Sequence, residues 1–379
     1  MIVLAGFLLL APVPIQGDAV SAPDHVVARM NPGASLSEDA AVAEALGRSL
    51  DAFLTEARDR AFTERCVDPA SLLRTEFFFQ GLSGLGSHEG SEPPTVLKSY
   101  TTDGSTYFVT VAFTAVREEA PFLSKIVELR ATPKDEGFRF DSPFTERTAD
   151  FRATNFGTVT FHHRNALDDP AAREFADFKE ELCRLAGAEN EELDYYVFQS
   201  LDELLKCYGF VYDAHRCNFL FRDLGFSDDG GRVFATGTGN PHYAFEYVGE
   251  FLKHHVADPD ELYGPFVVGI STCYGGYGLS GESVDELKGQ FRKKLFDDPE
   301  TDFLAEFKKG RKSSVQRHFS HFVLSAFLCE EILAKHGFEA ALRLASTGQD
   351  GARFFEELNT ILGINETNFH ATIRLLIEA

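Results

Sequence analysis

The residues with the clearest chemical potential lie at positions 240–246, which read Asn-Pro-His-Tyr-Ala-Phe-Glu. In the zinc-binding pattern H-E-x-x-H, two histidines on one helical face bind the metal, and the glutamate activates the metal-bound water. Here His242 takes the first position, Tyr243 replaces the glutamate and Glu246 replaces the second histidine. The pattern therefore keeps one imidazole and loses its proton acceptor, because a phenol is a poor base at neutral pH.

These residues are expected on an amphipathic helix over 242–256, because a proline suits the first turn of a helix. Polar residues recur there at four-residue steps, so neighbouring members of the set share a face. The set is His242, Glu246, Glu250 and His254. His242 and Glu246 offer a nitrogen and a carboxylate to a divalent metal, with Glu250, His254 or another domain as the source of a third ligand. The alternative is a solvated polar stripe on a helix whose other side is apolar.

The elements around this segment follow from periodicity. Helical spacing dominates after Pro241 and predicts helices at 242–256, 266–276, 281–296, 300–309, 314–336, 338–347, 351–362 and 366–378. Upstream, Asp169-Pro170 opens a helix that runs to Ala186, and Ser200 caps a helix that runs to Tyr208. Short strands are predicted at 195–198, 210–212, 219–221 and 233–236.

The first part of the chain has a different pattern. Leu36 to Arg65 reads as one long amphipathic helix. Alternating residues then predict strands at 106–116, 125–132, 138–141 and 158–163. A helix followed by a curled antiparallel sheet predicts a cone-like α+β domain, which resembles the nuclear-transport-factor-2-like fold in element order. We place the domain boundary near residue 166, where strand periodicity gives way to helix.

The segment from about residue 190 to 379 resembles the gluzincin-like metallopeptidases of the peptidase MA superfamily. Three features carry the resemblance: the approach Gly239-Asn240-Pro241-His242, a second helix over 265–276, and a closing run of helices with Gly363-Ile364-Asn365-Glu366-Thr367-Asn368-Phe369. The resemblance implies a mostly helical zincin-like domain with a small sheet. It also implies that the third zinc ligand of the family falls on Val268, which has no donor atom. Glu250, His254 and Tyr274 are candidates to line the former substrate cleft.

Composition limits the possible partners and the location. The 379 residues carry a net charge of -23, which argues against nucleic acids and against anionic membrane surfaces. The apolar run Ile2 to Pro12 is too short to span a bilayer and resembles the core of a secretory signal, although no basic residue precedes Arg29. We therefore expect a signal peptide at 1–23, no membrane span in the mature chain, and a periplasmic or extracellular protein. The alternative is a buried N-terminal strand.

The six cysteines show no C-x-x-C spacing, which argues against a cysteine zinc site. Cys207 and Cys217 flank a short connection and are the best candidates for a disulfide in an exported chain. The alternative is that all six are buried thiols.

These patterns lead to one preferred hypothesis and two rivals. The preferred protein has an N-terminal cone-like domain (24–165) and a gluzincin-like domain (166–379) that has lost its metal site. It needs no cofactor, is not an enzyme, and binds a peptide or protein. One rival is an active zinc metallopeptidase in which His242 and Glu246 belong to an unusual ligand set. The other is a structural or assembly protein whose cleft is filled by its own side chains, Tyr243 among them.

Overall fold

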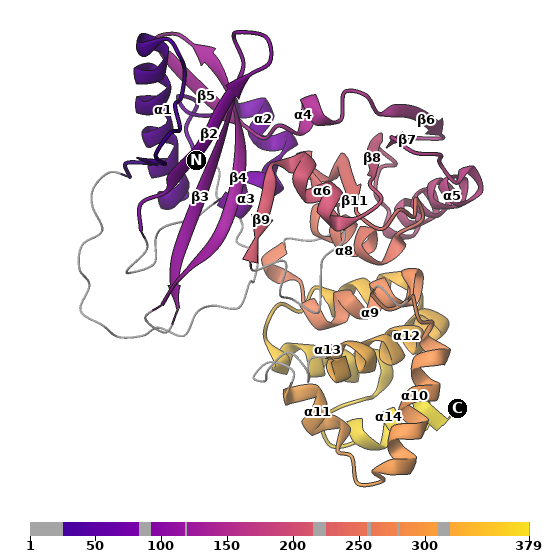
Figure 1. The fold of residues 1–379 in the computed structure, drawn as a ribbon. Coiled ribbons are helices and arrows are strands. Elements are labelled where there is room, and N and C mark those ends of the chain that lie inside the picture. The colour runs from indigo at the N-terminus through magenta and orange to yellow at the C-terminus, as the bar shows by residue number, and fades with distance from the viewer. Residues whose placement is uncertain are drawn as a thin grey trace.

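The computed structural model describes residues 26–82, 92–117, 120–214, 225–255, 259–278, 281–309 and 319–378. Within them the chain forms an α+β fold with two mixed sheets and a mostly helical C-terminal half, as the sequence predicts (Figure 1). The expected signal peptide, the predicted strand at 219–221 and Cys217 lie outside the described residues.

The first sheet has six strands in the order β1-β2-β3-β4-β5, with β9 paired to β4. The strands are β1 (Arg29–Met30), β2 (Thr95–Thr101), β3 (Tyr107–Arg117), β4 (Ala120–Lys134), β5 (Gly137–Asp141) and β9 (Phe210–Asp213). Only β1 and β2 are parallel. Register shifts within β2–β3, β3–β4 and β4–β9 mark bulges, which bend a sheet and increase its twist.

Helix α1 (Ala40–Asp59) packs on this sheet along one apolar stripe. The stripe consists of Leu46, Leu50, Phe53, Leu54 and Ala57. Phe53 lies against Phe140 of β5 with ring centroids 5.0 Å apart, and the backbone N–H of Phe138 donates to Ser49 Oγ at 3.0 Å. The helix is shorter than the predicted 36–65, because Asp39 accepts the Ala41 and Val42 N–H groups and so caps its start.

Two short helices that the sequence analysis missed connect the sheets. They are α2 (Pro69–Arg74) and α3 (Glu76–Leu82). Phe77 of α3 stacks on Phe226 of the second sheet, with ring centroids 3.5 Å apart and planes inclined by 8°. Phe78 and Phe79 on the same helix are buried in the first core. Consecutive phenylalanines of α3 thus pack on strands of both sheets, within one continuous core.

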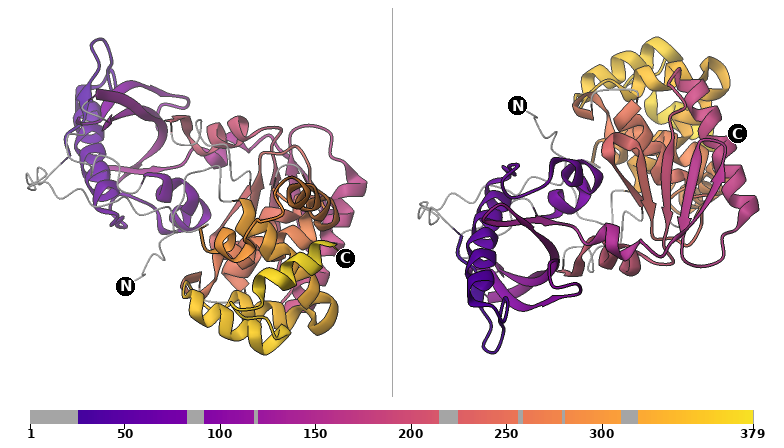
Figure 2. Two further views of the ribbon diagram at one scale, coloured as in Figure 1. Left: turned by 90° about the horizontal axis from the view of Figure 1, so that it is seen from below. Right: turned by 90° about the horizontal axis from the view of Figure 1, so that it is seen from above.

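The second sheet has five strands in the order β10-β11-β8-β7-β6. These are β6 (Arg152–Phe156), β7 (Val159–His163), β8 (Leu193–Val197), β10 (Gly225–Asp228) and β11 (Val233–Thr236), and Figure 2 shows them side by side. The central strands β7, β8 and β11 are parallel, and the edge strands β6 and β10 are antiparallel to them. The expectation that strand 158–163 belongs to the first, curled sheet is therefore wrong.

The division between the two sheets does not coincide with the domain boundary expected near residue 166. Strands β6 and β7 precede that position and lie in the second sheet, whereas β9 follows it and pairs with β4 of the first. Alternation alone could not show this, because the same alternation of side chains fits a strand of either sheet. The chain thus crosses between the sheets more than once.

Helices α5 (Asp169–Ala186) and α8 (Ala244–His255) cover one face of the second sheet. Phe161, Tyr195 and Phe234 are register partners on that face. Phe175 of α5 and Tyr247 of α8 pack on them and on each other, with 4.9 Å between the Phe175 and Tyr247 ring centroids. On the opposite face, Tyr196 packs against Phe144 of α4 (Phe144–Arg147).

The remaining helices lie close to their predicted positions. They are α6 (Leu201–Tyr208), α9 (Gly264–Gly275), α10 (Val284–Asp297), α11 (Phe303–Lys309), α12 (Phe319–Ala345), α13 (Gly351–Leu362) and α14 (Phe369–Glu378). Two 3-10 turns, η1 (Asp229–Gly231) and η2 (Pro259–Glu261), were not predicted. The predicted break at Gly337 is present as a kink within α12, where the φ of Gly337 is 76°. No helix formed by the described residues has both the length and the apolar character of a membrane span.

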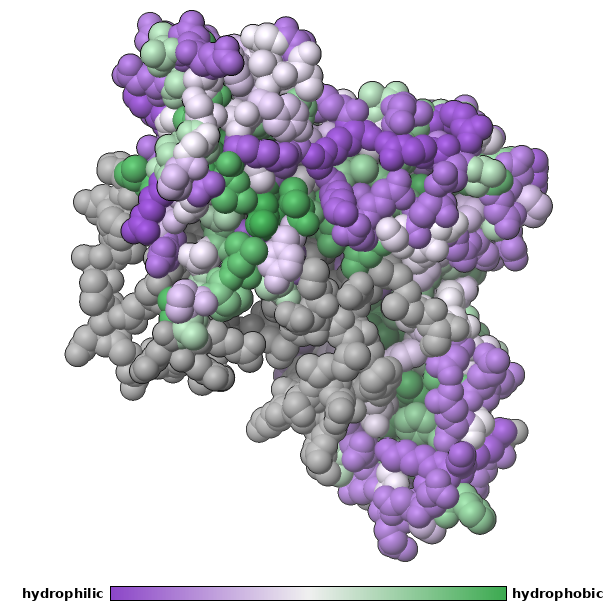
Figure 3. All heavy atoms as spheres, in the orientation of Figure 1, coloured by the Kyte–Doolittle hydropathy of each residue, from purple (hydrophilic) through white to green (hydrophobic). Residues whose placement is uncertain are grey.

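Apolar side chains are exposed at one end of the first sheet. They are Val116, Phe122, Leu123 and Val211. Figure 3 shows apolar surface over this part of the sheet, beside β9, whereas the C-terminal helices present a mostly hydrophilic surface in the same view. The β3–β4 hairpin and β9 therefore contribute the main apolar surface seen from this side.

A buried carboxyl group joins the second sheet to helices α3 and α6. Asp228, at the end of β10, is fully buried and accepts the backbone N–H of Phe77 (2.7 Å) and the hydroxyl of Tyr208 (2.7 Å). Burial raises its pKa to about 8, although both hydrogen bonds oppose that shift. The neutral acid is thus the form best suited to this position between α3, α6 and β10.

Substitution of Asp228 by asparagine should flatten the dependence of stability on pH. The folded carboxyl holds its proton up to about pH 8, whereas an unfolded aspartate loses it near about pH 4. The folded state binds more protons between these values, so stability should fall there as pH rises, by up to about 1.4 kcal/mol per unit. Asp228→Asn keeps an acceptor for Phe77 and should remove this component. Urea denaturation at pH values from 5 to 8 measures how the free energy of unfolding depends on pH. The control is Asp202→Asn, a change at an exposed aspartate. An unchanged slope in Asp228→Asn would contradict the assignment.

Candidate functional site

The approach to α8 holds His242 outside the helix. The Oδ1 atom of Asn240 accepts the His242 backbone N–H (2.9 Å), and its Nδ2 donates to the His242 carbonyl oxygen (3.2 Å). Helix α8 begins only at Ala244. The expectation of a helix from residue 242, which gave His242 and Glu246 a shared face, is therefore wrong by two residues. Asparagine competes with helix formation in this way because its side chain bonds the local backbone.

His242 lies against α5 instead. Its Nδ1 atom is 3.7 Å from Glu174 Oε2, and its ring centroid is 6.2 Å from that of Phe175 and 6.0 Å from that of Phe178. Desolvation by these neighbours lowers the pKa of His242, and the Glu174 carboxylate partly offsets that shift. The imidazole is thus largely neutral at pH 7 and half-buried in an aromatic setting beside one exposed acid.

The next two members of the predicted polar stripe, Glu246 and Glu250, lie against β10. A Cβ atom placed on Gly225 would lie 3.3 Å from Glu246 Cβ, and Glu250 Oε2 accepts the Ser227 hydroxyl at 2.7 Å. Glu250 also accepts from Lys253 Nζ (2.5 Å) and lies 3.9 Å from His254 Nε2. Glu250 is buried, and burial lowers the pKa of His254. A fully solvated stripe is therefore wrong for Glu250, which anchors α8 to the sheet edge.

Helix α9 supplies Val268 and Tyr274. The Val268 side chain has no donor atom, and its backbone carbonyl accepts the Thr272 hydroxyl at 2.8 Å. Tyr274 is half-buried, with ring centroids 6.0 Å from Phe178 and 5.9 Å from Phe338. The structure thus brings His242 and Tyr274 to the same residue of α5, Phe178. Tyr243, at the position of the lost glutamate, is buried.

Small residues allow α9 to approach α8 closely. A Cβ atom on Gly275 would lie 2.1 Å from the backbone nitrogen of Phe245 and 2.6 Å from its Cα. One on Gly249 of α8 would lie 3.6 Å from Ser271 Oγ of α9. The end of α9 is therefore pressed against the first turn of α8, immediately after His242 and Tyr243.

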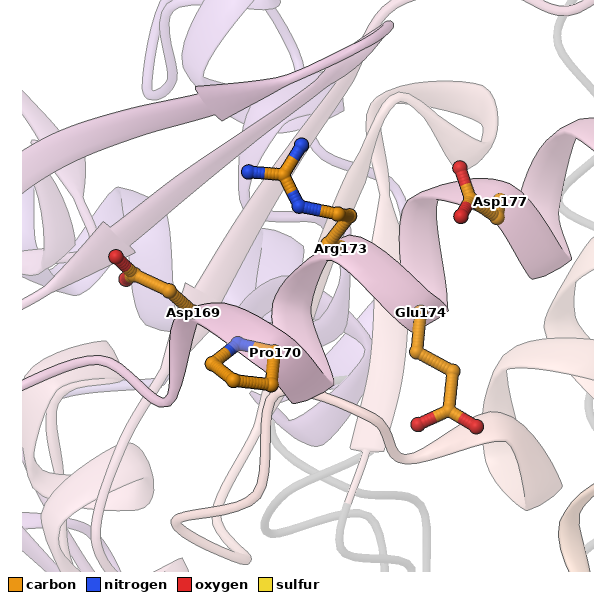
Figure 4. A pocket seen from close by; sticks show the side chains of 5 residues that line it. All are labelled: Asp169, Pro170, Arg173, Glu174 and Asp177. Atoms are coloured by element: carbon orange, nitrogen blue, oxygen red, sulfur yellow. The ribbon is translucent and has the colours of Figure 1, made fainter.

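A shallow surface cavity of about 580 Å³ opens beside this cluster. Its lining comes from the exposed side of α5 and consists of Asp169, Pro170, Arg173, Glu174 and Asp177 (Figure 4). Glu174 links the cavity to His242, because its carboxylate both lines the cavity and lies 3.7 Å from the imidazole. We call the surface formed by Glu174, Asp177, Phe178, His242 and Tyr274 the α5 surface.

The residues present do not fit the zinc site of the resembling family. The His242 side chain packs against α5, Glu246 faces β10, and the Val268 side chain has no atom that can bind a metal. Across the described ranges, no three or more histidine, cysteine, aspartate or glutamate side chains are grouped so as to hold a metal ion. Glu174 and Phe178 were not predicted as site residues. The periodicity of a helix shows which of its faces is apolar, but not which distant loop packs against the helix.

Comparison with known proteins adds no family to this picture. No family model matches the chain, and no curated protein is significantly similar to it. The resemblance to gluzincin-like metallopeptidases therefore stays a prediction that rests on the residues quoted above.

An alanine at position 275 tests the close approach of α9 to α8. The added methyl group must displace the Phe245 backbone, so Gly275→Ala should destabilise the protein by about 3 kcal/mol or more. Gly289→Ala is the matched control, because a Cβ atom there meets nothing within 4 Å on exposed α10. That change should stabilise by up to about 1 kcal/mol through helix propensity. If chemical denaturation gives the same change in the free energy of unfolding for Gly275→Ala and Gly289→Ala, the packing described is contradicted.

Proposed function

We propose that the protein is a metallopeptidase-like binding protein that holds a peptide or protein partner on the α5 surface and does not hydrolyse it. The single observation that carries the proposal is the position of His242. It lies outside α8, between Phe178 and the acidic edge of an open cavity, rather than beside Glu246. With the segment 1–23 as signal peptide, the proposal places the protein in the cell envelope or exterior.

The lining of the cavity favours a cationic partner. Asp169, Glu174 and Asp177 contribute carboxylates, and the guanidinium of Arg173 stacks on Phe156 with 4.8 Å to the ring centroid. The chain as a whole carries a net charge of -23. Charge of this sign raises the local concentration of a lysine- or arginine-containing ligand and speeds its association.

The aromatic members of the α5 surface favour an apolar or aromatic anchor next to that cation. Phe178, His242 and Tyr274 are each half-buried, so none of these three residues is fully closed off from solvent. Aromatic side chains bury much area for little lost conformational freedom, which is why they dominate binding sites. The proposed ligand is therefore a peptide segment with a lysine or arginine close to a large apolar residue.

No catalytic step is assigned to this site. In the resembling family the base is a glutamate, and here Tyr243 occupies that position with its side chain buried. A phenol is a poor proton acceptor at neutral pH, and Val268 supplies no third ligand to a metal. These features support binding without hydrolysis.

Binding to a library of short peptides tests the proposal. Fluorescence anisotropy with the full chain should select peptides that pair lysine or arginine with an aromatic residue, and affinity should fall as salt rises. Glu174→Gln should lower the affinity for the selected peptide by about 5-fold, because one carboxylate is lost from the cavity. Glu180→Gln makes the same charge change on α5 outside the cavity lining and should leave affinity within about 2-fold.

Two results would count against this function. One is that no peptide of the library binds at a concentration of about 100 μM, which is well above the dissociation constants of useful ligands. The other is equal loss of affinity in Glu174→Gln and Glu180→Gln, which would show that overall charge and not the α5 surface attracts the peptide.

A further inference from the structure

Two thiols from different helices meet behind the α5 surface. The side chains of Cys273 on α9 and Cys329 on α12 lie next to each other, and the Cys273 thiol donates to the carbonyl oxygen of Ala326, one turn before Cys329, at 3.5 Å. Cys329 is fully buried, whereas Cys273 is half-buried. The five described cysteines are all free thiols, and the expected partner of Cys207 lies outside the described residues.

The backbones that carry the two thiols are unusually close. One turn before Cys273, a Cβ atom on Gly269 would lie 2.7 Å from the carbonyl carbon of Ser325, which is one turn before Cys329. The two helices are therefore in close contact at Gly269 and Ser325. One turn further along each helix, the sulfur atoms of Cys273 and Cys329 face each other. A disulfide needs Cα atoms about 4.4–6.8 Å apart, which ordinary helix packing at 8–10 Å between axes seldom allows.

From this geometry we propose that Cys273 and Cys329 are a dithiol that closes to an α9–α12 disulfide on exposure to a low-molecular-weight disulfide oxidant. This modification site is independent of the proposed binding function. The cross-link would fix α9, which carries Tyr274, to the part of α12 that precedes its kink at Gly337.

The reaction is a thiol–disulfide exchange in two steps. The half-buried Cys273, as thiolate, attacks one sulfur of the oxidant, whose S–S bond breaks and releases one thiol after protonation. Cys329 then loses its proton to solvent and attacks Cys273 Sγ, forming the protein disulfide and releasing the second thiol. Two protein thiols are oxidised and one oxidant disulfide is reduced to two thiols. Burial raises the pKa of Cys329, so the second step should be the slow one.

Peptide mapping of the full-length folded protein tests the proposal. The protein is incubated with glutathione disulfide, its remaining thiols are alkylated, and it is digested with trypsin without reduction. Cleavage after lysine and arginine places Cys273 in peptide 254–288 and Cys329 in peptide 318–335. The expected product is these two peptides joined, and dithiothreitol should separate them. The joined species should be absent from Cys273→Ser and from Cys329→Ser and unchanged in Cys183→Ser, a buried thiol on α5.

Two outcomes would overturn the proposal. In one, both peptides are recovered alkylated after oxidant treatment of the folded protein. In the other, Cys273 carries glutathione and Cys329 stays reduced, which would show that the second sulfur cannot reach the first. Circular dichroism of each serine variant guards against a folding defect, since serine is close to cysteine in size.

Discussion

The contact on which the candidate site depends is the approach of the α9 backbone to the start of α8. Gly275 has no side chain, so the end of α9 lies where any Cβ atom would collide with Phe245. The Asn240 side chain bonds both backbone groups of His242 and keeps that residue in a turn. Together these two constraints begin α8 at Ala244 and leave His242 free to lie on α5. A helix two residues longer would bring His242 back above Glu246.

The same helix shows how one polar stripe can serve two different surfaces. Glu250 faces β10, where it accepts hydrogen bonds from the Ser227 hydroxyl and from the Lys253 ammonium, whereas His254 lies beside Gly231 of η1. A buried carboxylate tolerates such a position only with bonded partners. His242, two residues before the helix, instead meets aromatic rings and one exposed acid. Glu250 is therefore a structural member of the stripe, whereas His242 belongs to the α5 surface and His254, at the other end, is also exposed.

Sequence reasoning predicted the long, strongly periodic elements well and the contacts between elements poorly. Helices α5, α6, α9 and α13 end within about two residues of their predicted limits, because caps such as Asp168, Ser200 and Gly363 mark them. The short strands β1, β2, β6 and β10 were missed. β1 and β6 are edge strands of mostly exposed residues, whereas β2 lies inside the first sheet and β10 is largely buried. The sheet to which a strand belongs depends on long-range pairing, and no local pattern encodes it.

The candidate site shows the same limit more sharply. The residue types at 242, 243 and 246 depart from the H-E-x-x-H pattern, and that departure was readable from the sequence. The role of position 268 is only what the resemblance to gluzincin-like metallopeptidases implies. The first residue of α8 could not be predicted in this way. It lies two residues later than expected, because the Asn240 side chain forms hydrogen bonds with the backbone of His242. The partnership of His242 with Glu174 and Phe178, which lie more than sixty positions earlier in the chain, could not be predicted either. The close meeting of α9 with α12 depends on Gly269, whose role appears only when the helices are packed.

The central claim is that His242 and Glu246 face different parts of the molecule and do not act together on a metal. Calorimetric titration of zinc into metal-free protein tests this most directly, with His242→Ala and Glu246→Gln measured alongside. The account predicts that neither substitution changes the titration, because no tight binding depends on either residue. Binding of one zinc ion per chain with a dissociation constant below about 1 μM, abolished by both substitutions, would contradict it.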